Sequence, residues 1–237
     1  MTQDEKQDLW WAAAKGDEAA VKAALAAEPG LATESFEHNY QPTTVMTMLH
    51  VAASRDHVGV MQLLLAAGAD PMALAPPLKG RMTPLHCAGR GTGAAVKVLL
   101  DAGADPNAYV KRGTTPLYGA SYNGNVAGVR LLLDAGAHPE GKPASAVPLM
   151  AAAMESQVGV IDLLLSAGAK VDRKDNKKST ALHHAAHRGD VAVNRYLLEQ
   201  GLDPDQPNKK GETPRAMAAK NLWSDNREAL VALYNQQ

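Results

Sequence analysis

The sequence predicts an all-α repeat solenoid, which is a stack of short helix pairs. Two sequence markers recur with the same period of about 33 residues through most of the 237-residue chain. Hydrophobic residues make up 46% of the chain, mainly as Ala, Leu and Val, while aromatic residues make up only 4%. Small aliphatic side chains favour closely packed helices, and a fixed period of this length indicates a repeat architecture.

The first marker is a leucine-rich segment that ends near a glycine, and the second is a four-residue segment. The first reads MQLLLAAGADP (61–71), VKVLLDAGADP (96–106), VRLLLDAGAHP (129–139), IDLLLSAGAKV (161–171) and NRYLLEQGLDP (194–204). The second reads TMLH (47–50), TPLH (83–86), TPLY (115–118), VPLM (147–150), TALH (180–183) and TPRA (213–216). The glycines are spaced by 35, 33, 32 and 33 residues, and the second marker by 36, 32, 32, 33 and 33. Two independent markers in one register exclude a chance match.

Each unit is expected to contain two helices joined by a tight turn. Threonine caps unpaired N–H groups at a helix start, and proline at the first helical position lacks the N–H group that would go unpaired. A Gly-Asn or Gly-Asp pair then turns the chain, as at 124–125 and 189–190. The second helix ends at the marker glycine, because a left-handed residue is strained by a Cβ atom. An exposed turn leads to the next unit.

The TPLH and LLLxAGAD segments and their period resemble ankyrin repeats, from about residue 5 to residue 235. The resemblance implies antiparallel helix pairs, projecting hairpin fingers, a concave face, and protein binding without catalysis. In the last unit Arg215 and Ala216 replace the core-facing Leu and His, as suits a terminal unit. We expect one domain over 1–237, with an N-terminal cap at 5–30, internal repeats at 47–80, 83–113, 115–145, 147–178 and 180–211, and a C-terminal cap at 213–235.

Three histidines, His183, His184 and His187, fall within five positions. His183 aligns with His50 and His86, where the resemblance implies a structural hydrogen-bonding residue. His184 aligns with packing positions, and His187 ends a first helix. His183 and His187 could share one helix face, as zinc ligands do, so a metal-binding or enzyme-accessory function at 183–187 is the alternative. No third ligand is suitably spaced, and we expect no metal or cofactor.

Catalytic motifs are weak in this sequence. Ser121 and Cys87 have no paired base at a recognisable spacing, and Cys87 is expected to be buried and inert. The glycine-rich segment 89–93 lacks the Lys-Ser/Thr ending of a phosphate loop, and we interpret it as an altered helix turn. The sequence therefore predicts a protein that is not an enzyme.

Basic residues gather in the predicted fingers, although the formal net charge is −1. They are Lys79, Arg81, Lys111, Arg112, Lys142, Arg173, Lys174, Lys177, Lys178, Lys209 and Lys210. Stacked fingers would align them into a basic edge that attracts an acidic partner. The alternative is that they only keep the exposed turns soluble.

The ends of the first helices form a second candidate row of partner-binding residues. It comprises Arg90, Tyr122, Asn123, Met154, Glu155, His187 and Arg188. Tyr, Met and Arg are enriched at interface cores. The first two fingers, 31–46 and 69–82, are longer than the others, and the first contains Phe36 and Tyr40. Long loops often carry function, but these could also complete the N-terminal cap.

Charge and hydropathy limit the cellular locations and the classes of partner that we expect. Acidic residues occupy the start, where a secretory leader would be basic, and no run approaches 18 apolar residues. A single cysteine excludes an intramolecular disulfide and fits a reducing compartment. We expect a soluble, cytoplasmic monomer without membrane contact that binds another protein as scaffold, inhibitor or delivered effector. The charge balance and the scarcity of aromatic residues disfavour nucleic acid.

Overall fold

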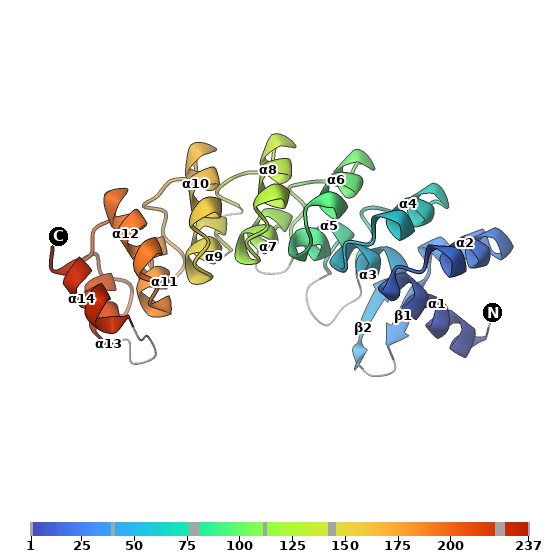
Figure 1. Cartoon of the computed structure of the whole chain (residues 1–237), viewed down its shortest axis with the longest axis horizontal. Coiled ribbons are helices and arrows are strands. Elements are labelled where there is room, and N and C mark those ends of the chain that lie inside the picture. Colours follow the sequence, from blue (N-terminus) through green and yellow to red (C-terminus); the bar gives the residue numbers. More distant parts are fainter. Residues whose placement is uncertain are drawn as a thin grey trace.

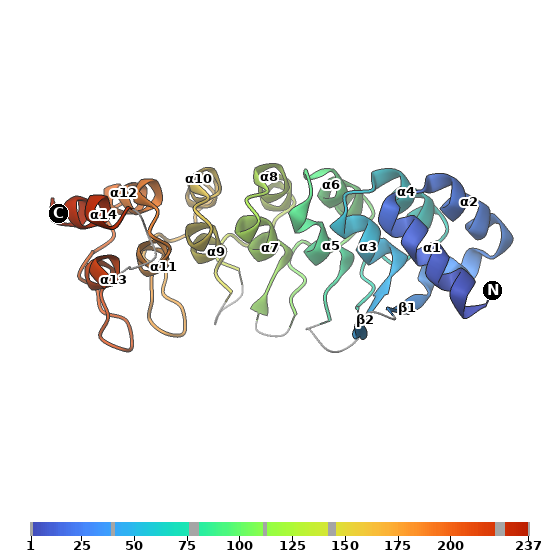
Figure 2. The same cartoon turned by 60° about the horizontal axis from the view of Figure 1, so that its bottom comes forward.

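The helices pack as antiparallel pairs, and the pairs stack side by side into an arch (Figure 1). The computed structural model describes residues 2–38, 41–75, 81–110, 113–141, 146–220 and 226–236, and the side chains within 36–45 lie outside that description. The inner helices are α1 (Gln3–Lys15), α3 (Met48–Ser54), α5 (Pro84–Cys87), α7 (Pro116–Tyr122), α9 (Pro148–Met154), α11 (Ala181–Arg188) and α13 (Pro214–Lys220). The outer row consists of α2 (Glu18–Ala27), α4 (Val58–Ala66), α6 (Ala94–Asp101), α8 (Val126–Asp134), α10 (Val158–Ser166), α12 (Val191–Glu199) and α14 (Arg227–Tyr234). Figure 2 shows that the fingers project from the inner helices on one side of the stack.

The predicted start and stop signals act as local chemistry requires. At α7, Thr115 Oγ1 accepts a hydrogen bond from the Tyr118 N–H at 3.2 Å, and Pro116 takes the first helical position. At α8, Asn125 Oδ1 accepts from the Gly128 N–H at 2.8 Å. The marker glycines, Gly68, Gly103, Gly136, Gly168 and Gly201, all adopt positive φ between 85° and 93°. Each outer helix therefore stops where a Cβ atom would be strained.

The segment 89–93 lies in an altered helix turn, as the sequence predicts. Helix α5 continues as a short 3₁₀ helix, η2 (Ala88–Arg90), before a bend leads into α6. The N-cap of α6 is Gly93, which has no side chain to cap the helix. Asp56 of the preceding pair replaces it, because its carboxylate accepts from the Thr92 and Ala95 N–H groups, both at 2.8 Å. A neighbouring unit therefore caps the shortened one.

The apolar core runs without a break along the whole stack. The equivalent leucines of the outer helices, Leu64, Leu99, Leu132, Leu164 and Leu197, are all fully buried. So are the equivalent alanines of the inner layer of helices, Ala52, Ala88, Ala120, Ala152 and Ala185. Small side chains at these alanine positions let neighbouring inner helices approach closely. Because each pair buries its apolar face against the next, stability comes from the interfaces between units.

The long first finger departs from the helical pattern. It contains a 3₁₀ helix, η1 (Pro29–Thr33), and an antiparallel hairpin of β1 (Ser35–His38) and β2 (Gln41–Thr47), with Ser35 opposite Thr47. The all-α class is confirmed for the stack, and this two-stranded sheet is an addition to it. Leu31 and Ala32 are buried, with η1 against α2. The beginning of this finger therefore completes the core of the N-terminal cap, one of the two alternatives that the sequence left open.

The C-terminal end is closed by one buried tyrosine. The Tyr234 side chain is only 1% exposed, and its hydroxyl donates to Asn194 Oδ1 of α12 at 2.7 Å. Asn194 in turn donates to the Ala185 carbonyl at 2.9 Å. Arg215 pairs with Asp205 at 2.8 Å and donates to the Tyr234 carbonyl. The substitution of Arg for the core-facing Leu thus suits a terminal unit, because Arg215 ties the last helix to the last finger.

Truncating a buried leucine should destabilise the stack strongly. We expect Leu132→Ala or Leu164→Ala to lower the free energy of unfolding by about 2–5 kcal/mol, because each substitution leaves a cavity in a fully buried interface. Urea denaturation followed by circular dichroism at 222 nm measures the change. Leu133→Ala, on the same helix but only partly buried, should cost clearly less. Equal costs at 132 and 133 would contradict the packing described.

Replacing a marker glycine tests the left-handed helix stop. Gly136 has φ +86°, and no atom lies near the position that a Cβ atom would take. Gly136→Ala should therefore cost about 1 kcal/mol through backbone strain alone. Asparagine tolerates the left-handed region better, so Gly136→Asn should cost less in the same urea titration. A neutral Gly136→Ala would show that the helix does not end in this way.

Candidate interaction surface

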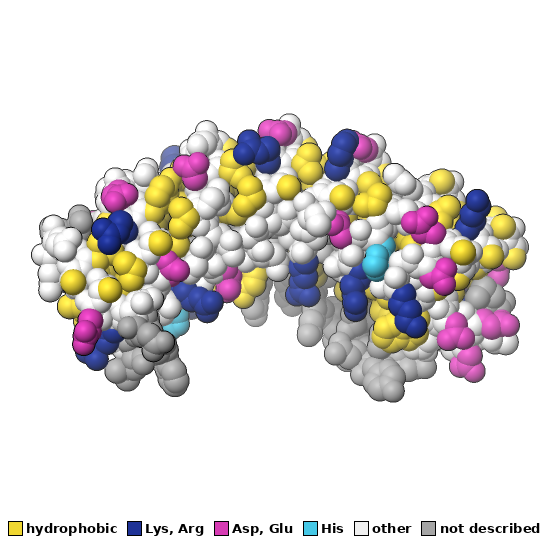
Figure 3. All heavy atoms as spheres, viewed as in Figure 1, with side chains coloured by type: hydrophobic (Ala, Val, Ile, Leu, Met, Phe, Trp, Pro, Cys, Tyr) yellow, Lys and Arg dark blue, Asp and Glu magenta, His cyan; other side chains and the backbone are white. Residues whose placement is uncertain are grey.

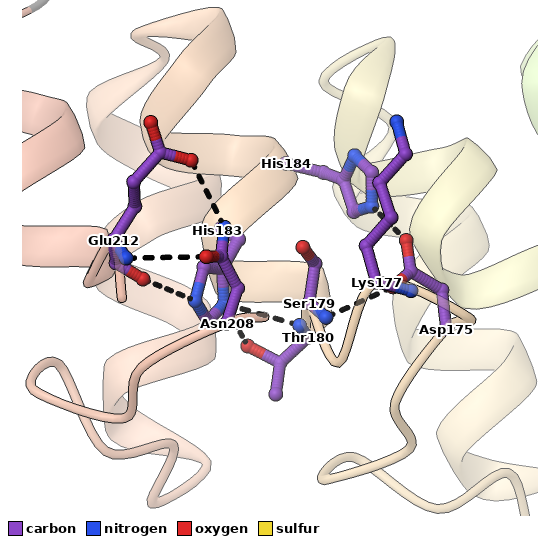
Figure 4. Close-up of polar contacts among 8 residues, drawn as sticks. All are labelled: Asp175, Lys177, Ser179, Thr180, His183, His184, Asn208 and Glu212. Atoms are coloured by element: carbon purple, nitrogen blue, oxygen red, sulfur yellow. Dashed lines mark hydrogen bonds and ion pairs between the residues drawn. The ribbon is translucent and has the colours of Figure 1, made fainter. Parts of the chain in front are cut away.

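His183 joins its own repeat to the next finger (Figure 4). It is buried, and its Nδ1 accepts the Thr180 N–H at 3.1 Å and lies 3.0 Å from Thr180 Oγ1. Since Nδ1 is an acceptor, the proton lies on Nε2, which donates to the Glu212 carbonyl at 3.2 Å. The predicted structural role of His183 is therefore confirmed.

The same clamp recurs in two earlier repeats. His50 Nδ1 lies 2.8 Å from Thr47 Oγ1, and its Nε2 lies 2.9 Å from the Met82 carbonyl. His86 Nδ1 lies 2.8 Å from Thr83 Oγ1, and its Nε2 lies 3.2 Å from the Thr114 carbonyl. In each case the histidine of one unit holds the base of the following finger. We call His50, His86 and His183 the histidine clamps.

Burial keeps the histidine clamps neutral. It lowers the pKa of His50 and His183, and it lowers the pKa of His86 from 6.5 to about 4. The hydrogen bond to the next finger opposes this shift but does not cancel it. At neutral pH each clamp is therefore an uncharged imidazole that has one donor and one acceptor in use.

The remaining two histidines do not converge on a metal site. His184 is half-buried, and its Nε2 lies 3.3 Å from Asp175 Oδ2 in the preceding finger (Figure 4). Burial lowers the pKa of His184, and the hydrogen bond to Asp175 opposes that effect. His187 is exposed at the end of α11. Within the described ranges, no group of three or more His, Cys, Asp or Glu residues could hold a metal ion, so the metal-dependent alternative gains no support.

The inner helix ends bring four of the predicted residues together on the concave side. Arg90, Tyr122, Glu155 and Arg188 come from four successive units. The Glu155 side chain, next to the Tyr122 hydroxyl, raises the pKa of Tyr122, while the charges of Arg188 and Arg90 act in the opposite direction. Glu155, Arg188 and Arg90 thus each lie near enough to Tyr122 to influence its titration. We call these four residues the inner row.

Other predicted residues lie beside the inner row with different exposure. The Tyr122 side chain is 41% exposed, whereas Met154 is only partly accessible. Asn123 is exposed, but its Nδ2 donates to the Gly119 carbonyl at 2.7 Å and helps to end α7. The inner row therefore presents a charged and aromatic surface with a smaller apolar contribution.

The described finger residues expose the expected basic side chains. Arg81, Lys177, Lys178, Lys209 and Lys210 are all exposed. Figure 3 shows Lys and Arg side chains along the hollowed edge of the arch and acidic side chains gathered at the N-terminal end. Six predicted residues fall outside the description, namely Lys79, Lys111, Arg112, Lys142, Tyr40 and the side chain of Phe36.

Sequence reasoning missed two exposed apolar side chains in the fingers. Tyr109 is 65% exposed and Leu74 is 45% exposed. The signal for Tyr109 was available, since an aromatic residue stands in a turn next to Lys111 and Arg112. These residues extend the candidate surface from the inner row onto the fingers.

Cys87 has the properties of a core residue and not of a nucleophile. It is buried at the end of α5, and burial raises the pKa of its thiol to about 12. A nucleophilic cysteine requires the thiolate form, so the prediction of a buried, inert thiol is confirmed. In the described part of the chain, no helix is long and apolar enough to cross a membrane.

The fold and this surface define a tandem helix-pair solenoid with a concave inner row and projecting fingers. The chain belongs to the ankyrin repeat family. The family model for ankyrin repeats (3 copies) matches residues 9–110, 79–143 and 149–237. Ankyrin repeats are generally protein–protein interaction modules, and the family is typically non-catalytic.

Solved structures share this architecture over nearly the whole chain. The ankyrin repeat domain of human ASB11 matches with a TM-score of 0.79 and 26% identity, covering 95% of this chain and 96% of that one. The ankyrin repeat domain of Bcl-3, a member of the IkappaB protein family, matches with a TM-score of 0.67 and 27% identity, covering 96% and 97%.

Curated relatives are much longer proteins. Palmitoyltransferase ZDHHC17 of Danio rerio is 36% identical over 187 residues, which is 76% of this chain and 30% of that protein. The transient receptor potential channel A1 homolog of Caenorhabditis elegans is 30% identical over 191 residues, which is 78% of this chain and 15% of that protein. The chain therefore spans less than a third of the length of these relatives.

The histidine clamps make stability depend on pH. Because the pKa of His86 is about 4 in the folded chain and 6.5 when unfolded, the unfolded chain binds more protons between these values. The contribution of His86 to the free energy of unfolding is therefore fully present above pH 6.5 and is lost progressively as the pH decreases towards 4. We expect urea denaturation at pH 5 to show a loss of about 2 kcal/mol from His86 alone, relative to pH 7. His86→Gln should reduce this difference, and a pH-independent free energy in the unaltered chain would contradict it.

Proposed function

We propose that this chain is a non-catalytic interaction module that binds a partner protein through its concave face and its fingers. The observation that carries the proposal is the inner row, in which four successive units contribute the exposed Arg90, Tyr122 and Arg188 and the partly buried Glu155. Tyrosine and arginine are the residue types that most often dominate binding energy at protein interfaces. The exposed lysines of the fingers favour a partner with an acidic surface.

The rigidity of the scaffold supports this proposal. Each unit is fixed to the next by a continuous core, and three of them also by a histidine clamp. A surface that is already ordered loses less conformational entropy when a partner binds. Such a module can act as a scaffold, or as an inhibitor that covers part of an enzyme. We place it in the cytoplasm and as a monomer before binding, in keeping with its free buried cysteine.

Charge reversal in the inner row tests the proposal. Tagged chain is used to capture partners from a lysate of the cells that express it, and the captured protein is then titrated by calorimetry. The Arg90→Glu/Arg188→Glu variant should bind at least about tenfold more weakly, because two contacts near the centre of the surface become repulsive. The control is Arg130→Glu/Arg195→Glu, which makes the same charge change at exposed positions of the outer helices α8 and α12.

The outcome is decided by the comparison of the two variants. Full binding by the outer-helix variant and weak binding by the inner-row variant support the concave face. Equal affinity of both variants, at unchanged stability, would reject the inner row as the binding surface.

A further inference from the structure

In three fingers the residues that flank the tip form the same two backbone hydrogen bonds. In the tips 110–114, 175–179 and 208–212, the first residue donates its N–H to the carbonyl of the fifth, at 3.1, 2.9 and 2.9 Å. The fourth residue of each tip donates back to the carbonyl of the first, at 2.9, 2.9 and 3.0 Å. The fourth position has positive φ in all three, and it is occupied by Gly113, Lys178 and Gly211.

Lys178 stands at a position that suits glycine, as does Arg81 of the second finger, which has φ +55° and also lies two residues before its repeat threonine. The φ of Lys178 is +59°, in the left-handed region where a Cβ atom is strained. The equivalent glycines adopt the same turn without this cost. Strained residues of this kind persist where they serve a site. The strain at Lys178 therefore suggests that its side chain is useful at this tip.

The tips of the fifth and sixth fingers, 175–179 and 208–212, are held together. The Lys209 N–H donates to the Lys177 carbonyl at 2.8 Å, and lower down Lys174 Nζ donates to Gln206 Oε1 at 3.0 Å. Each tip is also fixed from within. Asp175 Oδ1 accepts the Lys177 N–H at 2.7 Å. In the next tip, Asn208 Oδ1 likewise accepts the Lys210 N–H at 2.8 Å. The two tips thus form one preorganised platform that carries Lys177, Lys178, Lys209 and Lys210, which we call the lysine platform.

The carboxylates of the two tips, Asp175 and Glu212, accept hydrogen bonds from neutral groups and form no ion pair with the platform lysines that the structure records. Asp175 accepts from backbone N–H groups and faces His184 (Figure 4). Glu212 accepts from Asn208 Nδ2 at 3.2 Å, and Asp205 pairs with Arg215. Over the described residues, none of the four platform lysines forms an ion pair. Four like charges are held close together, which costs stability unless a ligand neutralises them.

We propose that the lysine platform is a docking site for an acidic segment of a polypeptide, rich in Asp and Glu. The proposal rests on the proposed function and names the partner chemistry that the fingers would recognise. Carboxylates on an extended segment would meet successive lysines on adjacent tips. A nucleic acid fits less well, because neither exposed tyrosine, Tyr109 or Tyr122, lies on these two fingers to stack a base.

The test uses a fluorescein-labelled deca-glutamate peptide and fluorescence anisotropy with the full chain. We expect binding that weakens as sodium chloride rises from 50 to 200 mM. Lys177→Glu/Lys209→Glu should weaken it by about tenfold or more. The control Lys22→Glu/Lys97→Glu, at exposed positions of α2 and α6, changes the net charge equally and should bind as the unaltered chain does.

Lys178→Gly separates binding from folding. Removal of the strain should raise the midpoint of thermal unfolding by about 2 °C, while loss of one charge should weaken peptide binding by about threefold. Opposite changes in stability and affinity are not expected of a lysine that only keeps the turn soluble. A lower unfolding midpoint, or unchanged affinity, would overturn the proposal.

Other outcomes would also overturn it. They are equal weakening in the platform and control variants, the absence of any binding to the peptide, or tighter binding of a labelled ten-nucleotide DNA at the same lysines. The failure of the proposed function would look different, because peptide binding would then depend on the lysine platform while capture of the protein partner stayed insensitive to charge reversal at Arg90 and Arg188.

Discussion

The structure depends on one constraint, which is that no helix pair can bury its apolar face alone. Each pair is short, and one side of it is lined by leucine and alanine side chains. These side chains are buried from solvent only when the next pair packs against them. The two ends need special solutions, since each has a neighbour on one side only. At the N-terminus Leu31 closes the core from the first finger, and at the C-terminus Tyr234 does so with its hydroxyl satisfied by Asn194.

Polar contacts between neighbouring units fix the relative positions of those units, which apolar packing alone does not. A hydrophobic interface alone does not fix how far one finger lies from the next, whereas an imidazole with one donor and one acceptor in use does. The histidine clamps set this relation at three interfaces, and Asp56 does so at the shortened turn by capping α6. Buried polar groups of this kind are favourable only when satisfied, so the clamps also exclude other arrangements of the stack.

The two candidate surfaces differ in chemistry because they lie on different parts of each unit. The inner row stands at helix ends and places arginine and glutamate around a tyrosine whose pKa they influence. The lysine platform stands on turn tips, where the carboxylates accept hydrogen bonds that hold the turns and the described residues show no ion pair with the platform lysines. Strain at Lys178 and crowding of like charges lower stability, a cost that is common where a site is built for binding. A partner could contact both surfaces at once, since both adjoin the hollow of the arch.

The sequence by itself determined the repeat period, the helix pairs, the left-handed glycine stops, the structural role of His183 and the inert Cys87. The period, the helix pairs and the glycine stops follow from local motifs that recur in register, the role of His183 from the resemblance to ankyrin repeats, and the inert Cys87 from its place in a first helix. Only the tertiary structure decided that Asp56 caps α6, that His184 meets Asp175, that the Lys209 N–H donates to the Lys177 carbonyl, and that a two-stranded hairpin enters the first finger. Each of these features occurs in one unit only, so the repeat pattern of the sequence could not predict it. They arise where residues far apart in the chain, or in differently shaped turns, are brought into contact by the stacking of neighbouring units.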